Sequence, residues 1–251
     1  MSKPKVKVAF FDFASCEGCQ IELTNLGDTV FLGLLEHIEI VEFREVMKET
    51  TSQRIDIAFI EGSFTREADR PRLESIRARA NVVVAYGSCA ATGGINALKN
   101  HQTDYREFVY GKDAEMPHLD SFQAQPISAA IQVDLAIPGC PIDQAEFARI
   151  VSDVLHGKAP TVPNYPVCVE CKLRETVCRY QSGDHCLGLV ARAGCGAPCP
   201  ADGVPCEACR GMVDSPNQPA LLQVLMEKGG LSQLRAETKS RLWTARFRNE
   251  E

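Results

Sequence analysis

The sequence lacks the two features that most directly indicate a membrane or a nucleic acid as partner. No stretch of the 251 residues is long and apolar enough to span a bilayer. Basic residues do not dominate either, because 27 Lys and Arg stand against 33 Asp and Glu, which gives a formal net charge of −6. We therefore expect no membrane span and no nucleic-acid partner.

The start of the chain also lacks the marks of an export signal. MSKPKVKVAFFDF runs directly into a strand-like segment, without a small-residue cleavage site or a twin arginine. On this basis we predict a cytoplasmic protein. Clustered cysteines in a reducing compartment bind metal more often than they form disulfides. The 12 cysteines of this chain are therefore candidate metal ligands.

The first 158 residues alternate between strand-like and helix-like segments. The runs IDIAFIEG and NVVVAYGS are almost continuously apolar, which is typical of strands buried on both faces of a sheet. Alternation of this kind predicts an α/β fold with a doubly wound parallel sheet. The expected strands cover Val6–Phe13, Glu39–Val46, Ile55–Glu61, Val82–Tyr86 and Val133–Ile137.

Three helices are expected between these strands or after the last of them. They cover Cys19–His37, Thr65–Ala80 and Ile142–His156, which carry apolar residues at roughly helical spacing. Thr65 is expected to cap the second helix, and Gly157 to end the third. In residues 97–130 the apolar residues follow neither the spacing of a helix nor that of a strand, so a surface excursion is expected there.

Four cysteines follow the expected strands. Cys16 and Cys19 come after the first strand, Cys89 after the fourth and Cys140 after the fifth. Ligands of open α/β sheets bind at the carboxyl ends of the strands, so these thiols are expected to converge there. The helix that opens at Cys19 would direct its N-terminus at an anionic cluster. Ordinary buried cysteines and a zinc site are the alternatives.

Residues 159–251 have a different composition, rich in Gly, Pro and Cys and poor in periodicity up to about residue 217. A segment of this kind cannot build a large core, so its order is expected to come largely from bound metal. The C-x2-C-x2-C-x3-C spacing of bacterial ferredoxins is absent, and zinc ribbons remain an alternative. The eight cysteines form two sets, Cys168, Cys171, Cys178 and Cys186, then Cys195, Cys199, Cys206 and Cys209.

These motifs together resemble a known family. SCEGCQ, GSCAATGG, PGCP, YPVCVECKL and CEACRG are similar to segments of the small subunits of NiFe hydrogenases, especially the delta subunits of cytosolic, bidirectional sulfhydrogenases. The resemblance implies a flavodoxin-like domain over residues 1–158. It also implies a loop-rich segment over residues 159–251 that binds two iron–sulfur clusters and ends in a helical tail from about Gln218.

The resemblance implies three 4Fe–4S clusters, each held by four cysteines. The ligands of the proximal cluster would be Cys16, Cys19, Cys89 and Cys140. The ligands of the medial cluster would be Cys195, Cys199, Cys206 and Cys209. The ligands of the distal cluster would be Cys168, Cys171, Cys178 and Cys186.

Several positions differ from the periplasmic members of that family or lack a fixed role. Cys168 stands where those members commonly have a histidine, and Cys199 stands where many have a proline, so a four-iron medial cluster is expected. His185 is then a bystander or a hydrogen-bond donor to a cluster sulfur. Glu61 matches a family glutamate near the proximal cluster, although it could simply cap or pair locally; Glu17 has no assigned role.

The function implied by the resemblance is electron relay rather than catalysis, so no catalytic residue is expected. The partners would be a NiFe hydrogenase large subunit and a flavin or iron–sulfur acceptor subunit. No G-x-G-x-x-G motif is present, so an NAD(P) site is expected on another chain. Deazaflavin- or heterodisulfide-reductase-linked hydrogenases, a complex I-like quinone-linked subunit and a zinc scaffold are the alternatives.

Overall fold

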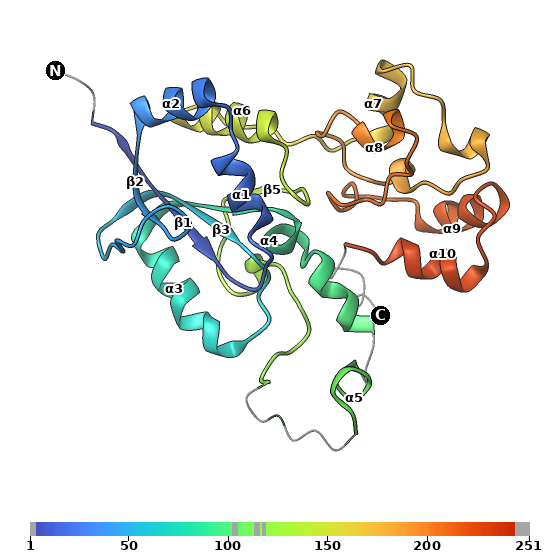
Figure 1. The fold of residues 1–251 in the computed structure, drawn as a ribbon, viewed down its shortest axis with the longest axis horizontal. Coiled ribbons are helices and arrows are strands. Elements are labelled where there is room, and N and C mark those ends of the chain that lie inside the picture. Colours follow the sequence, from blue (N-terminus) through green and yellow to red (C-terminus); the bar gives the residue numbers. More distant parts are fainter. Residues whose placement is uncertain (1–3, 102–104, 113–115, 117–118, 244–251) are drawn as a thin grey trace.

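The computed structural model describes residues 4–101, 105–112, 116 and 119–243, and for residues 28–32 the backbone alone (Figure 1). Its centre is a parallel sheet in the order β2-β1-β3-β4-β5. This strand order is that of flavodoxin-like folds, so the predicted doubly wound sheet is confirmed. The strands are β1 (Val6–Asp12), β2 (Ile38–Phe43), β3 (Ile55–Glu61), β4 (Ala80–Tyr86) and β5 (Leu135–Ile137).

Helices cover both faces of this sheet, because its strands are apolar on both sides. In Figure 1, α2 and α6 lie on one side of the sheet and α3 on the other. The first core joins Phe10 and Phe59 to Phe147 of α6, and the second joins Phe11 and Ile60 to α3. The helices of this part are α1 (Gly18–Thr24), α2 (Asp28–His37), α3 (Arg70–Arg79), α4 (Ser88–Thr92), α5 (Tyr105–Tyr110) and α6 (Gln144–Leu155).

Two details of the expected helices are wrong. The helix predicted over Cys19–His37 is two helices, because α1 ends at the C-cap Asn25 and α2 starts after Gly27 in an extended conformation. Asn and Gly both have low helix propensity, which explains the break. Thr65 does not cap α3: a 3-10 turn over Glu67–Asp69 precedes that helix, and the Thr65 carbonyl instead accepts from the Phe122 N–H at 2.8 Å.

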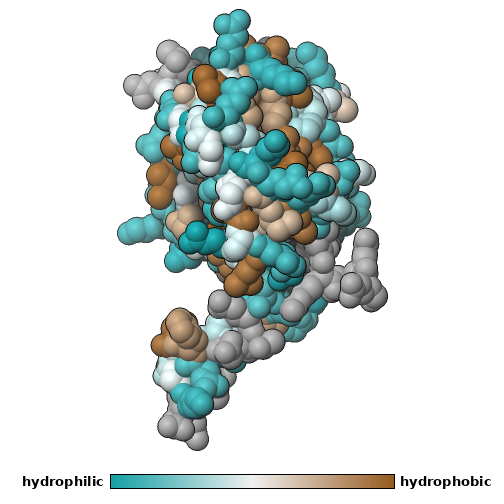
Figure 2. All heavy atoms as spheres, turned by 90° about the vertical axis from the view of Figure 1, so that its right-hand side faces the viewer, coloured by the Kyte–Doolittle hydropathy of each residue, from teal (hydrophilic) through white to brown (hydrophobic). Residues whose placement is uncertain are grey.

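The expected surface excursion contains short helical pieces where it is described. A 3-10 helix spans Ile95–His101, and α5 hangs below the body of the molecule in Figure 1. Phe108, Val109 and Tyr110 of α5 are exposed. Figure 2 shows hydrophobic surface on the projection at the bottom of the molecule, below a body that is mainly hydrophilic on this side. The rest of the excursion, 102–104, 113–115 and 117–118, lies outside the described residues.

The cysteine-rich part has short helices and long loops rather than a sheet. Its helices are α7 (Val167–Leu173), α8 (Pro198–Ala201), α9 (Gln218–Glu227) and α10 (Gln233–Ser240). The helical segment predicted from about Gln218 is present as α9 and α10, which pack on each other and against a third core that contains Cys186 and Cys206. Nowhere in the described ranges does a helix have both the length and the apolar character needed to cross a membrane.

Candidate metal centres

The first set of cysteines meets at the carboxyl edge of the sheet. Cys16 lies in the loop after β1, Cys19 in the first turn of α1, Cys89 in α4 directly after β4, and Cys140 in the loop after β5. Burial raises the pKa of Cys89 to about 12, with further contributions from Cys140 and Cys16. The pKa of Cys19 is also raised, first by burial and then by charges that include Cys140 and Cys89. The charges of these four thiols therefore act on one another at this edge of the sheet.

Two glycines let the backbone pass directly against these sulfur atoms. A Cβ atom at Gly87 would lie 2.5 Å from the Cys19 Sγ, and one at Gly94 would lie 2.8 Å from the Cys89 Sγ. Both residues also have positive φ angles, of 83° and 59°, which glycine adopts without strain. At both positions the backbone therefore approaches a cysteine sulfur more closely than a residue with a side chain would allow.

Glu61 ends β3 and points its carboxylate at the start of α1. Its two oxygens accept hydrogen bonds from the backbone N–H groups of Cys19 at 3.2 Å and Gln20 at 3.1 Å. Burial raises the pKa of Glu61, although these two bonds act in the opposite direction. Glu61 thus caps a helix whose own N-cap residue, Glu17, has a φ of 60° and makes no side-chain cap. Local capping, the simpler expectation for Glu61, is what the structure supports.

The second set surrounds α7 and the turn that follows it. Cys168 and Cys171 lie on α7, Cys178 precedes the 3-10 turn at Arg179–Ser182, and Cys186 precedes another at Leu187–Leu189. Burial raises the pKa of Cys168 to about 11, with Cys186, Cys171 and Cys178 as the next largest causes.

His185, next to this set, does not contact a sulfur atom in any described hydrogen bond. Its Nε2 lies 3.1 Å from the Glu207 Oε1. Glu207 also receives a short hydrogen bond from Lys239 of α10. His185 therefore takes part in a polar link between the cysteine loops and α10.

The third set lies between the other two. The Cys206 N–H donates to the Cys186 Sγ at 3.3 Å, which joins it to the second set. On the other side, burial and then Cys209 and Cys16 raise the pKa of Cys140 to about 11. The Ser88 hydroxyl also donates a short hydrogen bond to the Cys209 carbonyl. The order in space is thus the sheet-edge set, the set from Cys195 to Cys209, and the set from Cys168 to Cys186.

The donor chemistry of the three sets fits iron–sulfur clusters. Within the described part of the chain, no three His, Cys, Asp or Glu side chains are arranged to hold one metal ion. The cysteines are instead spread in sets of four thiols, and backbone N–H groups of Ile142, Ala197 and Ala208 face the sulfur atoms of Cys19, Cys195 and Cys206. Thiolate ligation with N–H donors to sulfur is characteristic of iron–sulfur centres.

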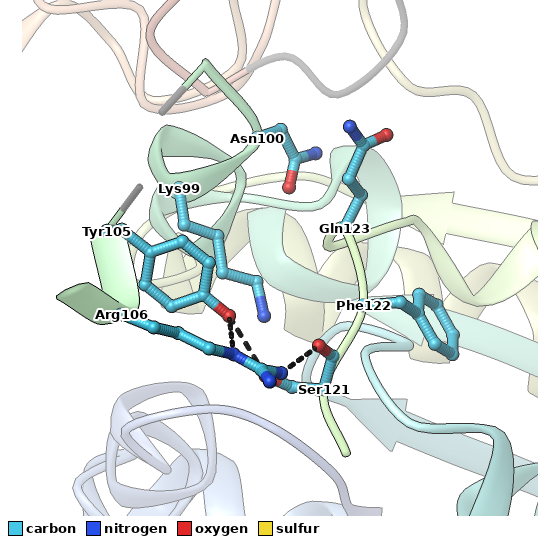
Figure 3. Close-up of a pocket in the computed structure, with 7 residues that line it drawn as sticks. All are labelled: Lys99, Asn100, Tyr105, Arg106, Ser121, Phe122 and Gln123. Carbon is cyan, nitrogen blue, oxygen red and sulfur yellow. Dashed lines mark hydrogen bonds between the residues drawn. The ribbon is translucent and has the colours of Figure 1, made fainter. Parts of the chain in front are cut away.

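A separate cavity of about 430 Å³ lies beside the excursion and contains no cysteine (Figure 3). Lys99 and Arg106 reach its space, and Arg106 Nη2 donates to the Ser121 carbonyl at 2.6 Å. Burial lowers the pKa of Lys99. This cavity is a polar surface feature next to α5, and no sequence pattern indicates it because residues 97–130 lack a clear period.

Sequence reasoning missed the charged pair Glu146 and Arg210, which lies between the sheet edge and the third set. One of its members carried a signal, because Glu146 is four residues before Ile150 and so shares the buried face of α6. Arg210 follows Cys209 directly in a loop, where no periodicity distinguishes a buried side chain from an exposed one.

Comparison with known proteins identifies the family of this chain. The family model described as NADH ubiquinone oxidoreductase, 20 Kd subunit, matches residues 16–154. Sulfhydrogenase 2 subunit delta of Pyrococcus furiosus is 35% identical over 224 residues, covering 88% of this chain and 93% of that protein. A chain of the vhu F420-non-reducing hydrogenase of Methanocaldococcus jannaschii is 34% identical, with 83% of each chain covered.

A solved structure of an NAD+-reducing [NiFe]-hydrogenase in the H2-reduced state is also similar. It has a TM-score of 0.55 and 26% identity, and the match covers 64% of this chain and 96% of that one. The family model ends before Cys168, whereas the sulfhydrogenase match extends over most of both chains. The chain belongs to the NADH ubiquinone oxidoreductase 20 kDa subunit family and, within it, to the small subunits of NiFe hydrogenases.

Proposed function

We propose that this chain is the electron-relay subunit of a NiFe hydrogenase and that it holds three 4Fe–4S clusters. The observation that carries the proposal is the row of three four-cysteine sets, joined by Cys140 with Cys209 and by Cys206 with Cys186. The clusters would supply one-electron carriers that link the hydrogen-converting centre to an acceptor. The chain itself would supply thiolate ligands, N–H donors to sulfur, and burial.

The ligand assignment within the proposal follows the three sets. The proximal cluster is assigned to the sheet-edge set, the medial cluster to the set from Cys195 to Cys209, and the distal cluster to the set from Cys168 to Cys186. Their spatial order supports this assignment, because Cys206 of the set proposed as medial bonds Cys186, and its Cys209 carbonyl bonds Ser88, the neighbour of Cys89. No side chain of this chain is assigned a role in breaking or forming hydrogen.

Partners are proposed for the two ends of the row. Ile21 is exposed two residues after Cys19, and Ile95 is exposed where its backbone faces Cys89; we assign this apolar surface to the large subunit. At the other end, Val177 is exposed beside the exposed Cys178. We assign that end to an electron-acceptor subunit. A cytoplasmic location is proposed as well, since free thiols in this number suit a reducing compartment.

Metal analysis of the anaerobically purified protein tests the cluster proposal. We expect a brown protein with about twelve iron atoms per chain, four for each cluster. A colourless protein with stoichiometric zinc would contradict the relay function and favour a zinc scaffold. About four iron atoms with eight free thiols would instead favour a single-cluster, complex I-like subunit.

The terminal acceptor is proposed to be NAD(P), through a flavin or iron–sulfur subunit, because one structural relative is an NAD+-reducing hydrogenase. A deazaflavin-linked acceptor is the second candidate, since one relative is named a coenzyme F420 hydrogenase. A heterodisulfide-reductase-linked acceptor is the third, since another relative is named F420-non-reducing, which requires an acceptor other than F420. Co-purification followed by mass spectrometry, with H2-dependent reduction of NAD(P)+ or F420 by the purified complex, discriminates between them. Reduction of F420 without reduction of NAD(P)+ would contradict the first choice.

A further inference from the structure

A buried arginine joins the sheet-edge loop to the loop of the middle cysteine set. The Arg210 side chain is 2% exposed and makes a hydrogen bond with each of its three nitrogen atoms. Nη1 donates to the Pro138 carbonyl at 2.7 Å, Nε to the Ala193 carbonyl at 2.9 Å, and Nη2 to the Glu146 Oε1 at 2.8 Å. Pro138 lies two residues before Cys140, so one guanidinium ties together the loops of two cysteine sets.

Glu146 is the counter-charge of this arginine. Its side chain is 4% exposed, and both carboxylate oxygens lie within 2.8 Å of Nη2. Burial raises the pKa of Glu146, and the Arg210 charge acts in the opposite direction. A buried ion pair of this kind is expensive to desolvate and is not in itself a strong stabiliser. Its position next to the cysteines therefore calls for a role other than stability.

The positive charge of Arg210 lies beside the middle set. Arg210 follows Cys209 directly in the chain, and its Nε bonds the Ala193 carbonyl, two residues before Cys195. A second acid, Glu170 of α7, accepts the Gly194 N–H at 2.8 Å, next to Cys195. The middle set thus lies beside one fixed cation, with Glu146 and Glu170 close to it.

Gly194 lies in close contact with this ion pair. A Cβ atom at this position would lie 2.3 Å from the Arg210 Nη2 and 2.6 Å from the Glu146 Oε1. The residue also has a φ of 121°, a conformation that side chains rarely adopt. The chain between Ala193 and Cys195 therefore passes over the ion pair at a distance that only glycine allows.

We propose that Arg210 is a positioning residue that holds the Cys140 and Cys209 loops together and supplies a fixed positive charge to the middle cysteine set, while Glu146 moderates that charge. This inference rests on the proposed function, because it concerns the cluster assigned to Cys195, Cys199, Cys206 and Cys209. A positive charge favours the form that carries the additional electron, so Arg210 raises the reduction potential of the medial cluster and Glu146 lowers it.

The two partners of the pair consequently have effects of opposite sign. Arg210→Gln removes the cation and is expected to lower the medial potential. Glu146→Gln keeps an acceptor for Arg210 but removes the opposing charge, so it is expected to raise the potential. The double variant is expected to lie between the two single variants. Arg210→Lys keeps the positive charge but loses the three-way hydrogen bonding. Its medial potential is therefore expected to lie much closer to that of the wild type than to that of Arg210→Gln.

The test is a redox titration of the purified hydrogenase complex, monitored by electron paramagnetic resonance, together with iron analysis of each variant. We expect Arg210→Gln to change the reduced-to-oxidised ratio of the medial cluster about tenfold at fixed solution potential, which is about 59 mV for one electron. Arg192→Gln is the matched control: Arg192 bonds the Pro163 carbonyl and pairs with Asp214 in the same region of the fold.

The possible results separate this inference from the proposed function. Iron-loaded variants in which both glutamine substitutions shift the medial potential in the same direction, or not at all, would overturn the charge role. Loss of the medial signal in Arg210→Gln and Arg210→Lys alike, with normal potential in Glu146→Gln, would overturn it too, because only packing would then matter. Wild-type protein without an iron–sulfur signal would instead overturn the proposed function itself.

Discussion

The sheet region, up to α6, and the cysteine region that follows it are organised by different forces. The sheet region has an apolar core on each face of five hydrogen-bonded strands. In the described residues after α6, by contrast, strand pairing is limited to isolated bridges, such as Pro166 with Arg192 and Ala191 with Met212. The single core there includes two cysteines, Cys186 and Cys206, among its buried members.

This difference indicates what stabilises each region. Continuous burial of apolar side chains stabilises the sheet region without any ligand. In the cysteine region, buried thiols with raised pKa values stay neutral unless a cation compensates their charge. Under the proposed function, metal binding there would be coupled to folding, because the loops that supply the thiols form no sheet. The two regions should therefore respond differently to loss of iron.

Removal of iron should have the largest effect on this comparison. After chelation under denaturant-free, reducing conditions, we expect amides of α7, α8 and the loops between them to lose protection from hydrogen exchange. Amides of β1, β3 and β4 should stay protected, because their hydrogen bonds and cores involve no ligand. Hydrogen exchange followed by mass spectrometry measures both. Equal loss of protection in the two regions would mean that the sheet also depends on the clusters.

Substitution of a single cysteine should remove iron from one set at a time and so test the two regions separately. Cys89→Ser should remove about four of the expected twelve iron atoms and leave the secondary structure intact, because Cys89 lies in the short helix α4, after a strand that packs independently. Cys206→Ser should remove at least as much iron and also loosen the neighbouring set, because loss of the metal would release the loop that holds the Cys206 N–H against the Cys186 Sγ. Iron analysis and circular dichroism check both. If Cys206→Ser left the neighbouring cluster signal unchanged, the two sets would be independent.

Substitutions in the two cores test whether the packing of each region depends on iron. Ile60 of β3 and Leu225 of α9 are both fully buried, the first in the sheet region and the second in the cysteine region. Ile60→Ala should cost about 2–5 kcal/mol of unfolding free energy with or without iron. Leu225→Ala should have a comparable cost only in the iron-loaded protein, because its core is otherwise loose. Denaturant titrations of the iron-loaded and iron-free proteins measure these costs. An equal cost of Leu225→Ala in the iron-free protein would show that the core of the cysteine region does not depend on iron.

Much of the sheet region could be predicted from its sequence, because its strands are continuous apolar runs. The β3 limits agree with the expectation, and β1 and β4 differ by a few residues at one end. The convergence of Cys16, Cys19, Cys89 and Cys140 could also be predicted, since parallel strands end at one edge. The break between α1 and α2 was missed because the apolar spacing continues through Gly27.

The cysteine region could be predicted in its composition but not in its geometry. Spacing along the chain divides its eight cysteines into two sets, yet it does not say which set lies next to the sheet. That order depends on contacts between distant residues, such as the Ser88 hydroxyl with the Cys209 carbonyl. The burial of Arg210 is likewise a property of the folded loops, and no local pattern reveals that its partner is Glu146, 64 residues away.

The smallest expected effect concerns an ion pair in the sheet region, far from any ligand role. Asp134 accepts from the Val83 N–H at 2.7 Å and from Arg77 Nη1 at 2.6 Å. Burial alone would raise the pKa of Asp134, but these two partners outweigh it and the pKa is lowered. A carboxyl group with a lowered pKa in the folded protein stabilises it above the unfolded pKa, near 4, and loses that effect as pH falls further.

Asp134→Asn should therefore cost about 0.5–1 kcal/mol at neutral pH, a value reduced for the partial exposure of the pair. The difference from the wild type should shrink as the pH falls below about 4. Hydrogen exchange of the β4 amides between about pH 3 and pH 7 measures it at the site. Asp153→Asn is the matched control, because its pair with Arg149 lies on the surface of one helix and is worth about 0.3–0.5 kcal/mol. A pH-independent cost for Asp134→Asn would show that the geometry of its hydrogen bonds, and not its charge, stabilises the β4–β5 edge.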